Sequence, residues 1–346
     1  FNDLIVDDIK ISGVVVDEGY YYDALSLDFD EIQIKSYDNY SLKGLQIKGI
    51  SLISHFFNSS IGNILLDNFD NFDSFVALLD NQYQLGGLDS IDTQNAMNYY
   101  GVNRFSIEDV NVEFNQSHVE YEIEVGLIDL TVGRNDKKFL VADSIKYELK
   151  KLRVPFSSFE PYIAFETYQK ILEWDDEFIF NAYGSLNADT KNSSVEYEIQ
   201  YGIEKLGSIY SKLEFGGYTE DLIEKSINDP YYFEKVEALN DVTLKSVNLV
   251  YTDEGLNTLG FKTLYEMGIS RQDLQFSADQ LITSSPFITS KYKIQLMNAL
   301  QNLMAGGIKI DISFNSKYPD GIKLGEFEYL TLYNFDRYGE FLIKVE

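Results

Sequence analysis

Carboxylates are the only residue type in this chain that is both abundant and able to do catalytic chemistry. The chain has 56 acidic side chains, two histidines and no cysteine. The lack of cysteine excludes a thiolate nucleophile, cysteine-ligated zinc and iron–sulfur clusters. Two carboxylates can hydrolyse a glycosidic bond without any local motif, but 56 candidates give no means of choosing a pair. We therefore assign no catalytic, cofactor-binding or metal-ligating residue from the sequence.

Both histidines stand in contexts that favour structural roles. His118 precedes an alternating stretch and shares a strand face with glutamates, as expected of a solvated polar face. His55 stands next to Phe56 and Phe57, where an imidazole at the edge of the core is the ordinary interpretation. A Ser–His–Asp triad would need one of these two residues, and neither has a supporting motif. The zinc-protease motif HExxH, the Walker loop and the glycine-rich GxGxxG and GxSxG motifs are also absent from the sequence.

Acidic and aromatic residues recur every three positions between Asp67 and Phe75 (DNFDNFDSF). Two interpretations are open: a calcium-binding loop, or an aromatic edge that docks on the core with acids beside it. The EF-hand pattern lacks its glycine and its terminal glutamate here. The aromatic edge is therefore the favoured interpretation.

The net charge disfavours polyanionic partners. It is −28 at pH 7, and the arginines number only five and are scattered along the chain: Arg104, Arg134, Arg153, Arg271 and Arg337. Proteins that bind nucleic acids need basic stripes, so we expect no nucleic-acid partner. Adhesion to anionic lipid headgroups through charge is disfavoured for the same reason.

Alternating hydrophobicity predicts strands over much of the chain. Leu25, Leu27 and Phe29, followed by Ile32 and Ile34, alternate with polar residues, which is typical of strands covered on one face. Helices are predicted at 92–100, 158–174, 255–267, 270–282 and 286–305. The predicted fold class is α+β, predominantly antiparallel β with amphipathic helices packed on one face, and elongated. We expect one continuous β-rich domain over residues 1–346, with a more helical part at 218–307.

An internal repeat is also present. Ser117–Leu130 (SHVEYEIEVGLIDL) and Ser193–Leu206 (SSVEYEIQYGIEKL) match at eight of fourteen positions, 76 residues apart. Two readings are open: chance similarity of amphipathic strands, or duplicated β-modules that span 105–130 and 181–206. The modular reading predicts that Tyr121 and Tyr197 point into apolar contacts, with bends near Gly126 and Gly202. It also predicts solvent access for five glutamates: Glu120, Glu122, Glu124, Glu196 and Glu198.

Two segments carry a resemblance to known proteins. Leu25–Ile53 (LSLDFDEIQIKSYDNYSLKGLQIKGISLI) resembles the N-terminal part of AsmA-like and YdgA-like bacterial envelope proteins, and Val242–Leu256 (VTLKSVNLVYTDEGL) is similar to their closing part. Together these segments and the following helix cover about a quarter of the chain. The resemblance implies a periplasmic protein tethered at its N-terminus, in a group of which some members handle lipids in a hydrophobic β-groove. It implies no catalytic residues.

The expected function is that of a non-enzymatic exported envelope protein that presents or shields a hydrophobic surface. Its expected partner is lipid or another envelope protein, with the predicted helix Pro286–Ala305 as a lid and with no cofactor. A structural subunit of an extracellular assembly, formed by self-association, is the alternative, and a carboxylate-dependent glycoside hydrolase is the third reading. We expect a periplasmic or extracellular location with an N-terminal signal or anchor removed, and no transmembrane segment, because no run of about 18 apolar residues occurs.

Overall fold

The computed structural model describes twelve stretches of the chain: residues 6–20, 23–38, 41–54, 57–70, 101–116, 119–133, 143–155, 177–229, 231–232, 236–286, 288–329 and 335–346. The chain divides into two compact units. The first holds the described residues between Val6 and Pro155 together with Glu177–Tyr183, and the second holds those from Gly184 to Glu346. Each unit is described by itself. The expectation of one domain over residues 1–346 stays a prediction.

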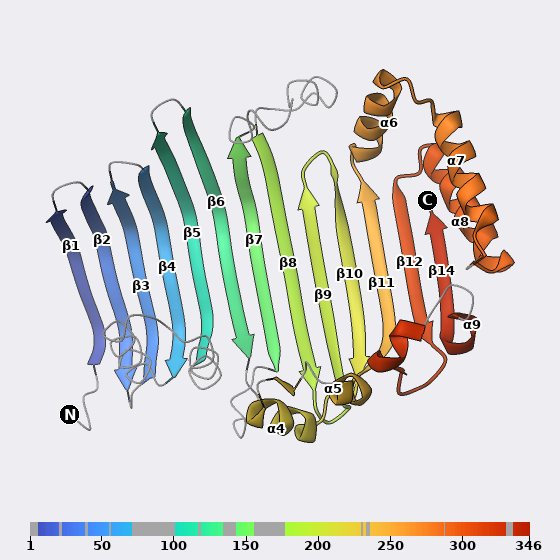
Figure 1. The fold of residues 1–346 in the computed structure, drawn as a ribbon. Coiled ribbons are helices and arrows are strands. Elements are labelled where there is room, and N and C mark those ends of the chain that lie inside the picture. The colour runs from blue at the N-terminus through green and yellow to red at the C-terminus, as the bar shows by residue number, and fades with distance from the viewer. Residues whose placement is uncertain are drawn as a thin grey trace. The chain divides into compact units, whose positions relative to one another are not determined.

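The first unit is an antiparallel sheet whose strands follow one another in chain order (Figure 1). Its strands are β1 (Val6–Tyr20), β2 (Asp23–Asp38), β3 (Ser41–Ile53), β4 (Phe57–Asp70), β5 (Gly101–Gln116), β6 (Val119–Gly133), β7 (Ser144–Pro155) and the first part of β8 (Glu177–Asp189). Each pair from β1·β2 to β6·β7 is antiparallel. The predicted antiparallel, β-rich fold is thus confirmed in this unit.

The second unit continues with antiparallel strands and adds helices. Its strands after β8 are β9 (Ser194–Ile203), β10 (Gly207–Gly216), β11 (Thr243–Asp253), β12 (Lys309–Ser316), the short β13 (Ile322–Lys323) and β14 (Gly339–Val345). Its helices are α4 (Glu220–Asn228), α5 (Val236–Asp241), α6 (Leu256–Glu266), α7 (Arg271–Ser284), α8 (Ser290–Met304), the 3-10 helix η3 (Leu324–Tyr329) and α9 (Phe335–Tyr338). Strand residues therefore outnumber helical ones in the described part of the chain, as predicted.

Local capping explains where the helices begin and end. The Ser270 hydroxyl accepts a hydrogen bond from the Asp273 N–H, and the Asp273 carboxylate accepts one from the Ser270 N–H, which is a capping box at the start of α7. Gly268 ends α6 in the left-handed region at φ 80°. The helix predicted from Pro286 was four residues too long at its start, because α8 begins at Ser290 after the N-cap Thr289.

Several predicted features lie outside the described residues. These are the helices at 92–100 and 158–174, both histidines, and the part of the acidic–aromatic segment beyond Asp70. The preceding residues Asp67–Asp70 belong to β4.

The pairing of the strands β1 to β7 is interrupted at one common level across the sheet. One residue per strand drops out of the paired register, while the residues on either side of it stay paired. These residues, which we call the crease, are Gly13, Asp30, Gly49, Gly62, Asp109, Gly126 and Lys151. Three of them have left-handed backbones: Gly49 (φ 58°), Asp109 (φ 54°) and Lys151 (φ 53°). The Lys151 N–H donates to the Asn181 side-chain carbonyl at 2.9 Å, which links the crease to β8.

The crease changes the phase of the side-chain alternation in each strand. The four-residue segments that contain it read ISGV, FDEI, IKGI, IGNI, IEDV, VGLI and LKKL, with an apolar residue at both ends. Residues three apart lie on opposite faces of a regular strand, so a regular strand would expose one of the two ends on the polar face. The irregular step at the crease instead allows both ends to join one face.

Tertiary packing in the second unit is concentrated in small clusters. Leu244, Phe314 and Ile322 form one buried cluster, and Leu222, Tyr232 and Ala238 form another. The fully buried Tyr292 of α8 packs edge-on against Phe341 of β14, with ring centroids 5.5 Å apart. Its hydroxyl donates to the Asp336 carboxylate at 2.7 Å. Helix α8 therefore covers the last strand of the sheet, which is a common way to protect an edge.

Gly49→Ala should destabilise the protein by about 1–2 kcal/mol, because a side chain at left-handed φ carries that strain and the Asp30 side chain already fills the space of the new Cβ. Gly260→Ala is the matched control. Gly260 lies inside α6 with no atom near its would-be Cβ, so alanine should stabilise by about 0.5–1 kcal/mol. Urea unfolding of both variants measures the difference, and equal free energies of unfolding would contradict the assignment of the crease.

The Tyr292–Asp336 contact should make the free energy of unfolding depend on pH in the acidic range. The Tyr292 hydroxyl, followed by the Lys291 ammonium, lowers the pKa of Asp336 below its ordinary value. A carboxyl with a lowered folded-state pKa stabilises the fold above its unfolded pKa of about 3.9, and this contribution is lost as the pH falls through the folded-state pKa.

Tyr292→Phe keeps the ring and removes the hydrogen bond. The loss of unfolding free energy between neutral pH and about pH 3 should therefore be smaller in this variant than in the wild type. Tyr265→Phe, on an exposed ring, should titrate like the wild type. An unchanged pH profile in Tyr292→Phe would refute the linkage.

Candidate functional site: the apolar face of the sheet

In the first unit, apolar side chains form rows that run from strand to strand. The register places like residues beside one another in β2 to β7. Three rows are Phe29–Ile50–Ile61–Val110–Val125–Leu152, Ile32–Ile47–Ile64–Ile107–Ile128–Leu149 and Ile34–Leu45–Leu66–Phe105–Leu130–Tyr147. The first two rows flank the crease on opposite sides. The phase change therefore joins them into one apolar face.

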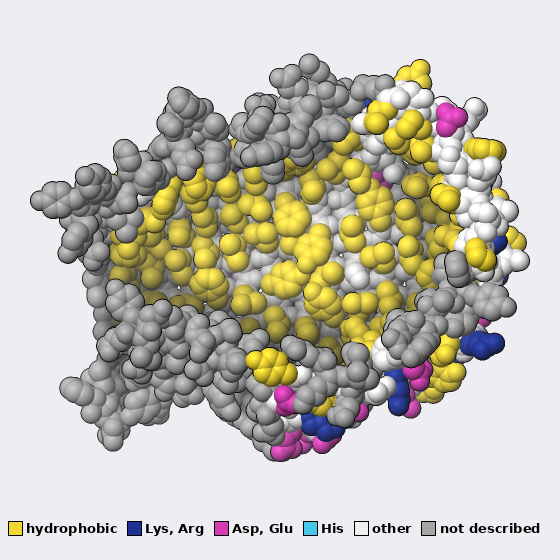
Figure 2. Space-filling model, in the orientation of Figure 1, with side chains coloured by type: hydrophobic (Ala, Val, Ile, Leu, Met, Phe, Trp, Pro, Cys, Tyr) yellow, Lys and Arg dark blue, Asp and Glu magenta, His cyan; other side chains and the backbone are white. Residues whose placement is uncertain are grey.

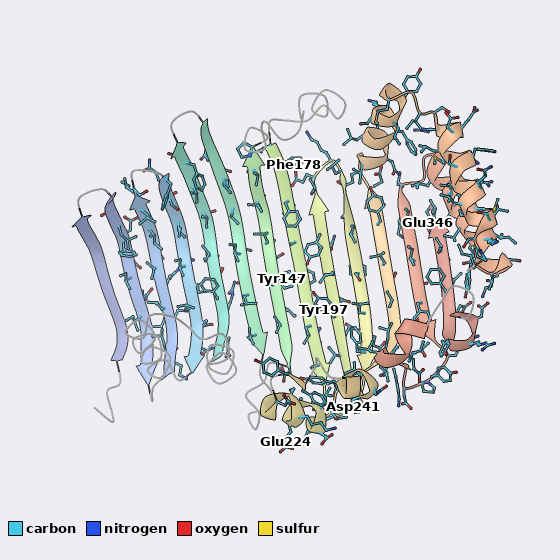
Figure 3. The ribbon with its side chains drawn as sticks, in the orientation of Figure 1. Tyr147, Phe178, Tyr197, Glu224, Asp241 and Glu346 are labelled. Atoms are coloured by element: carbon cyan, nitrogen blue, oxygen red, sulfur yellow. The ribbon has the colours of Figure 1, made fainter. Side chains whose placement is uncertain are left out.

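The second unit repeats this arrangement with aromatic residues among the aliphatic ones. Its rows through β9, β10, β11, β12 and β14 follow from the antiparallel register. They are Tyr201–Ile209–Tyr251–Ile310–Val345, Ile199–Ser211–Leu249–Ile312–Ile343 and Tyr197–Leu213–Val247–Phe314–Phe341. Figure 3 labels Tyr147 of the first unit and Tyr197 of the second on their strands.

Much of this apolar face is open. Figure 2 shows hydrophobic side chains filling the area between the strand ends. Ile128 is 36% exposed and Ile209 is 46% exposed, although each lies within a paired strand. Four large hydrophobic side chains of the named rows are exposed: Ile128, Leu130, Tyr201 and Ile209. Contiguous exposed apolar surface of this kind marks a site for an apolar partner.

The opposite face of the sheet carries the charges, paired across strands. In the second unit the Lys212 ammonium lies 2.7 Å from the Glu196 carboxylate and 2.9 Å from that of Glu198. The same ammonium is the main cause of a lowered pKa for Glu198. In the first unit Lys48 pairs with Glu31 at 3.4 Å and Arg104 with Asp129 at 2.8 Å.

Partial burial raises the pKa of tyrosines that also bond to carboxylates. Desolvation, followed by the hydrogen bond to Glu198, raises the pKa of Tyr210. Desolvation, followed by a hydrogen bond to the Asp253 carboxylate at 2.6 Å, also raises the pKa of Tyr251. These tyrosines remain neutral donors at physiological pH. They therefore order side chains and offer no general base.

The repeat prediction is confirmed in its strands and wrong in one detail. Both matched segments form strands, β6 and β9, and Tyr197 lies in an apolar row. Glu122 and Glu124 are exposed, and Glu196 and Glu198 are partly accessible. Tyr121 and Glu120 have side chains outside the described set.

The detail that is wrong concerns the glycines. Gly202 lies one residue before the end of β9, as predicted, whereas Gly126 lies within β6, whose pairing continues to Gly133. Gly126 belongs to the crease and marks a phase change instead of a strand end. The duplication of β-modules stays a prediction.

No group of three or more His, Cys, Asp or Glu side chains in the described stretches is placed to hold a metal ion. None of the described helices has the length and hydropathy needed to cross a bilayer.

The alternation and a presented or shielded hydrophobic surface were both expected from the sequence, whereas the rows across the strands that build this surface were not. The signal was available in the recurring segments of the crease, since seven strands share an apolar residue at each end of four positions. The extent of the face follows only once the register aligns these segments side by side.

The two faces should differ in their response to the same new side chain. Lys212→Gln should change the free energy of unfolding by about 0–1 kcal/mol, because exposed ion pairs contribute little. Leu213→Gln, at the next residue but on the apolar face, should cost about 1–2 kcal/mol, since full burial of leucine gives about 1.5–3 kcal/mol and Leu213 is half-buried. Denaturant unfolding checks the order, and a larger cost for Lys212→Gln would contradict the assignment of faces.

Comparison with known proteins assigns no family. No protein-family model matches the chain, and no curated protein sequence matches it. The function is therefore inferred from the geometry of the two-faced sheet.

Proposed function

We propose that this protein is a non-enzymatic exported envelope protein that binds the acyl chains of lipids on the apolar face of its sheet. The observation that carries the proposal is the set of open rows of aliphatic and aromatic side chains on that face. Each methylene group removed from water contributes about 0.8 kcal/mol. A ligand of many methylenes gains most from such a surface.

The dimensions of the rows suit an acyl chain. Neighbouring strands lie about 4.8 Å apart, so a row across six strands is about 24 Å long. The hydrocarbon core of a bilayer is about 30 Å thick, or about 15 Å for each leaflet. A single row in the first unit can therefore accommodate the full length of an ordinary acyl chain.

The charge distribution favours ligands without a large negative charge. The cross-strand ion pairs of the sheet, such as Lys212–Glu196, lie on the opposite face. The chain as a whole carries −28, which repels anions at long range. Zwitterionic or neutral lipids are therefore the proposed ligands of the sheet.

The proposed location is the periplasm or the cell exterior, supported by the resemblance of Leu25–Ile53 to AsmA-like and YdgA-like envelope proteins. Helix α8, within the predicted lid segment, is proposed to cover part of a bound chain. Its amphipathic sequence, which carries two lysines and no acidic residue, supports this role. Packing of further helices on the same face belongs to the same proposal.

Self-assembly is the second candidate function, and one observation favours it. Helix α8 covers β14, whereas β1 pairs with β2 on one side and with none of the other described strands. A free edge strand can pair with a second chain. This candidate predicts regular homo-oligomers without bound lipid.

The test uses adjacent residues on opposite faces. Ile128→Lys places a charge in an apolar row, whereas Leu127→Lys places the same charge beside Glu108 and Lys150 on the other face. Extraction of a fluorescent phosphatidylcholine from vesicles measures binding. Ile128→Lys should reduce extraction about tenfold or more, because a lysine in an apolar site costs several times RT, and Leu127→Lys should leave it near the wild-type level.

The second unit offers a matching pair of substitutions, Ile209→Lys and Ser208→Lys. These two residues lie on opposite faces of β10. Native mass spectrometry of the purified protein provides an independent readout. Co-purified lipid that is lost only in the apolar-face variants supports the proposal. Equal extraction by both members of each pair, or lipid-free homo-oligomers, would overturn it and favour assembly.

A further inference from the structure

A cavity separate from the sheet rows lies where α6 is followed by α7. Its volume is about 400 Å³, and it is lined by Thr258, Phe261, Lys262, Tyr265, Ile269 and Arg271. This volume is within the usual range of about 300–1,000 Å³ for small-molecule sites. All six lining residues come from α6, the turn after it, and the first residue of α7.

The turn between the helices fixes the shape of the cavity. The Gly268 N–H donates to the Tyr265 carbonyl and the Ile269 N–H donates to the Leu264 carbonyl, both at 2.9 Å. This double hydrogen bond with glycine at φ 80° folds the chain back over the end of α6. The capping box of Ser270 then starts α7 at once. Ile269 and Arg271 are thereby held facing the α6 residues.

Arg271 is oriented by two contacts and keeps donors for a ligand. Its guanidinium lies over the Phe261 ring, 4.2 Å from the centroid, and its Nη1 donates to the Met304 carbonyl at 3.2 Å. A guanidinium has five N–H donors in a planar fork, so this hydrogen bond leaves four. A fork fixed by stacking is suited to bind a carboxylate through two parallel hydrogen bonds.

The charge of the lining is opposite to that of the chain. Among the described residues that line the cavity two are cationic, Lys262 and Arg271, and none is acidic, although acidic residues outnumber basic ones 56 to 28 in the sequence. The remaining walls are largely apolar, with the rings of Phe261 and Tyr265 and the side chain of Ile269. Cations beside an apolar wall are complementary to an anionic group on a hydrocarbon chain.

We propose that this cavity binds the carboxylate of a fatty acid. Arg271 accepts the carboxylate in its planar fork, with the Lys262 ammonium adding a second positive charge. Phe261, Tyr265 and Ile269 contact the first methylenes of the chain. The repulsion from the rest of the acidic protein is screened beyond about 8 Å at physiological ionic strength, whereas the cations of the lining act at shorter range. This site does not depend on the proposed role of the sheet face.

Isothermal titration calorimetry of the full chain with octanoate at about 0.15 M salt tests the proposal. Lys262→Gln is the primary variant, because its exposed side chain makes misfolding an improbable cause of any loss. It should weaken octanoate binding about tenfold, and Arg271→Lys, which keeps the charge and loses the fork, should weaken it by about the same factor. Lys344→Gln removes the same charge from an exposed position on β14 and should leave the affinity unchanged.

The ligand series separates headgroup from chain. Octanol has the chain without the carboxylate, acetate has the carboxylate without the chain, and inorganic phosphate is an anion without a chain. Each should bind at least tenfold more weakly than octanoate, because each lacks one of the two complementary parts. Octanol or phosphate binding as tightly as octanoate would overturn the proposal, as would equal effects of Lys262→Gln and Lys344→Gln.

Ile209→Lys distinguishes the cavity from the sheet. This variant should lose phosphatidylcholine extraction and keep its octanoate affinity. Loss of octanoate binding in Ile209→Lys would place the fatty acid on the sheet and overturn the cavity site while leaving the sheet function intact. Octanoate binding that depends on Lys262, in a protein that extracts no phospholipid, would support the cavity and contradict only the sheet function.

Discussion

The fold depends on keeping charged side chains off one face of the sheet. Side chains in a strand alternate between faces with a period of two, so a slip of one residue would exchange the two faces. An unpaired buried carboxylate costs several kcal/mol, more than a buried isoleucine returns. The strands β1 to β7 nevertheless all break their alternation at the same level, at the crease. The left-handed backbones of Gly49, Asp109 and Lys151 accommodate that break without moving apolar residues to the charged side.

An open apolar face shifts the source of stability toward contacts within the sheet. The described residues contain few fully buried hydrophobic side chains, and most of these lie in the second unit. Neighbouring side chains in the same row therefore provide much of the burial, as cross-strand pairs do in other sheets. The contact of Tyr292 with Phe341 and Asp336 closes the sheet at β14, where a bare edge would otherwise invite pairing with another chain.

Local features of the sequence predicted local structure well. Ser270 and Gly268 lie where helices begin or end, because capping depends on residues within one turn. The crease could not be predicted from any one strand, since Gly62 and Asp109 meet only after the chain has travelled from β4 to β5. The cavity was missed for the same reason: Phe261 and Arg271 meet only through the turn at Gly268, and neither residue belongs to a motif.

The charged face and the apolar face together favour a lipid over a second copy of the chain. Two copies that joined their apolar faces would each bring a net charge of −28, and such repulsion acts over several ångströms even in physiological salt. An acyl chain covers the same apolar surface without adding charge. The cross-strand ion pairs of Lys212 and Arg104 compensate only a small part of the acidic excess. The excess of carboxylates therefore has a physical consequence of its own, because like charge opposes the close approach of two copies through their apolar faces.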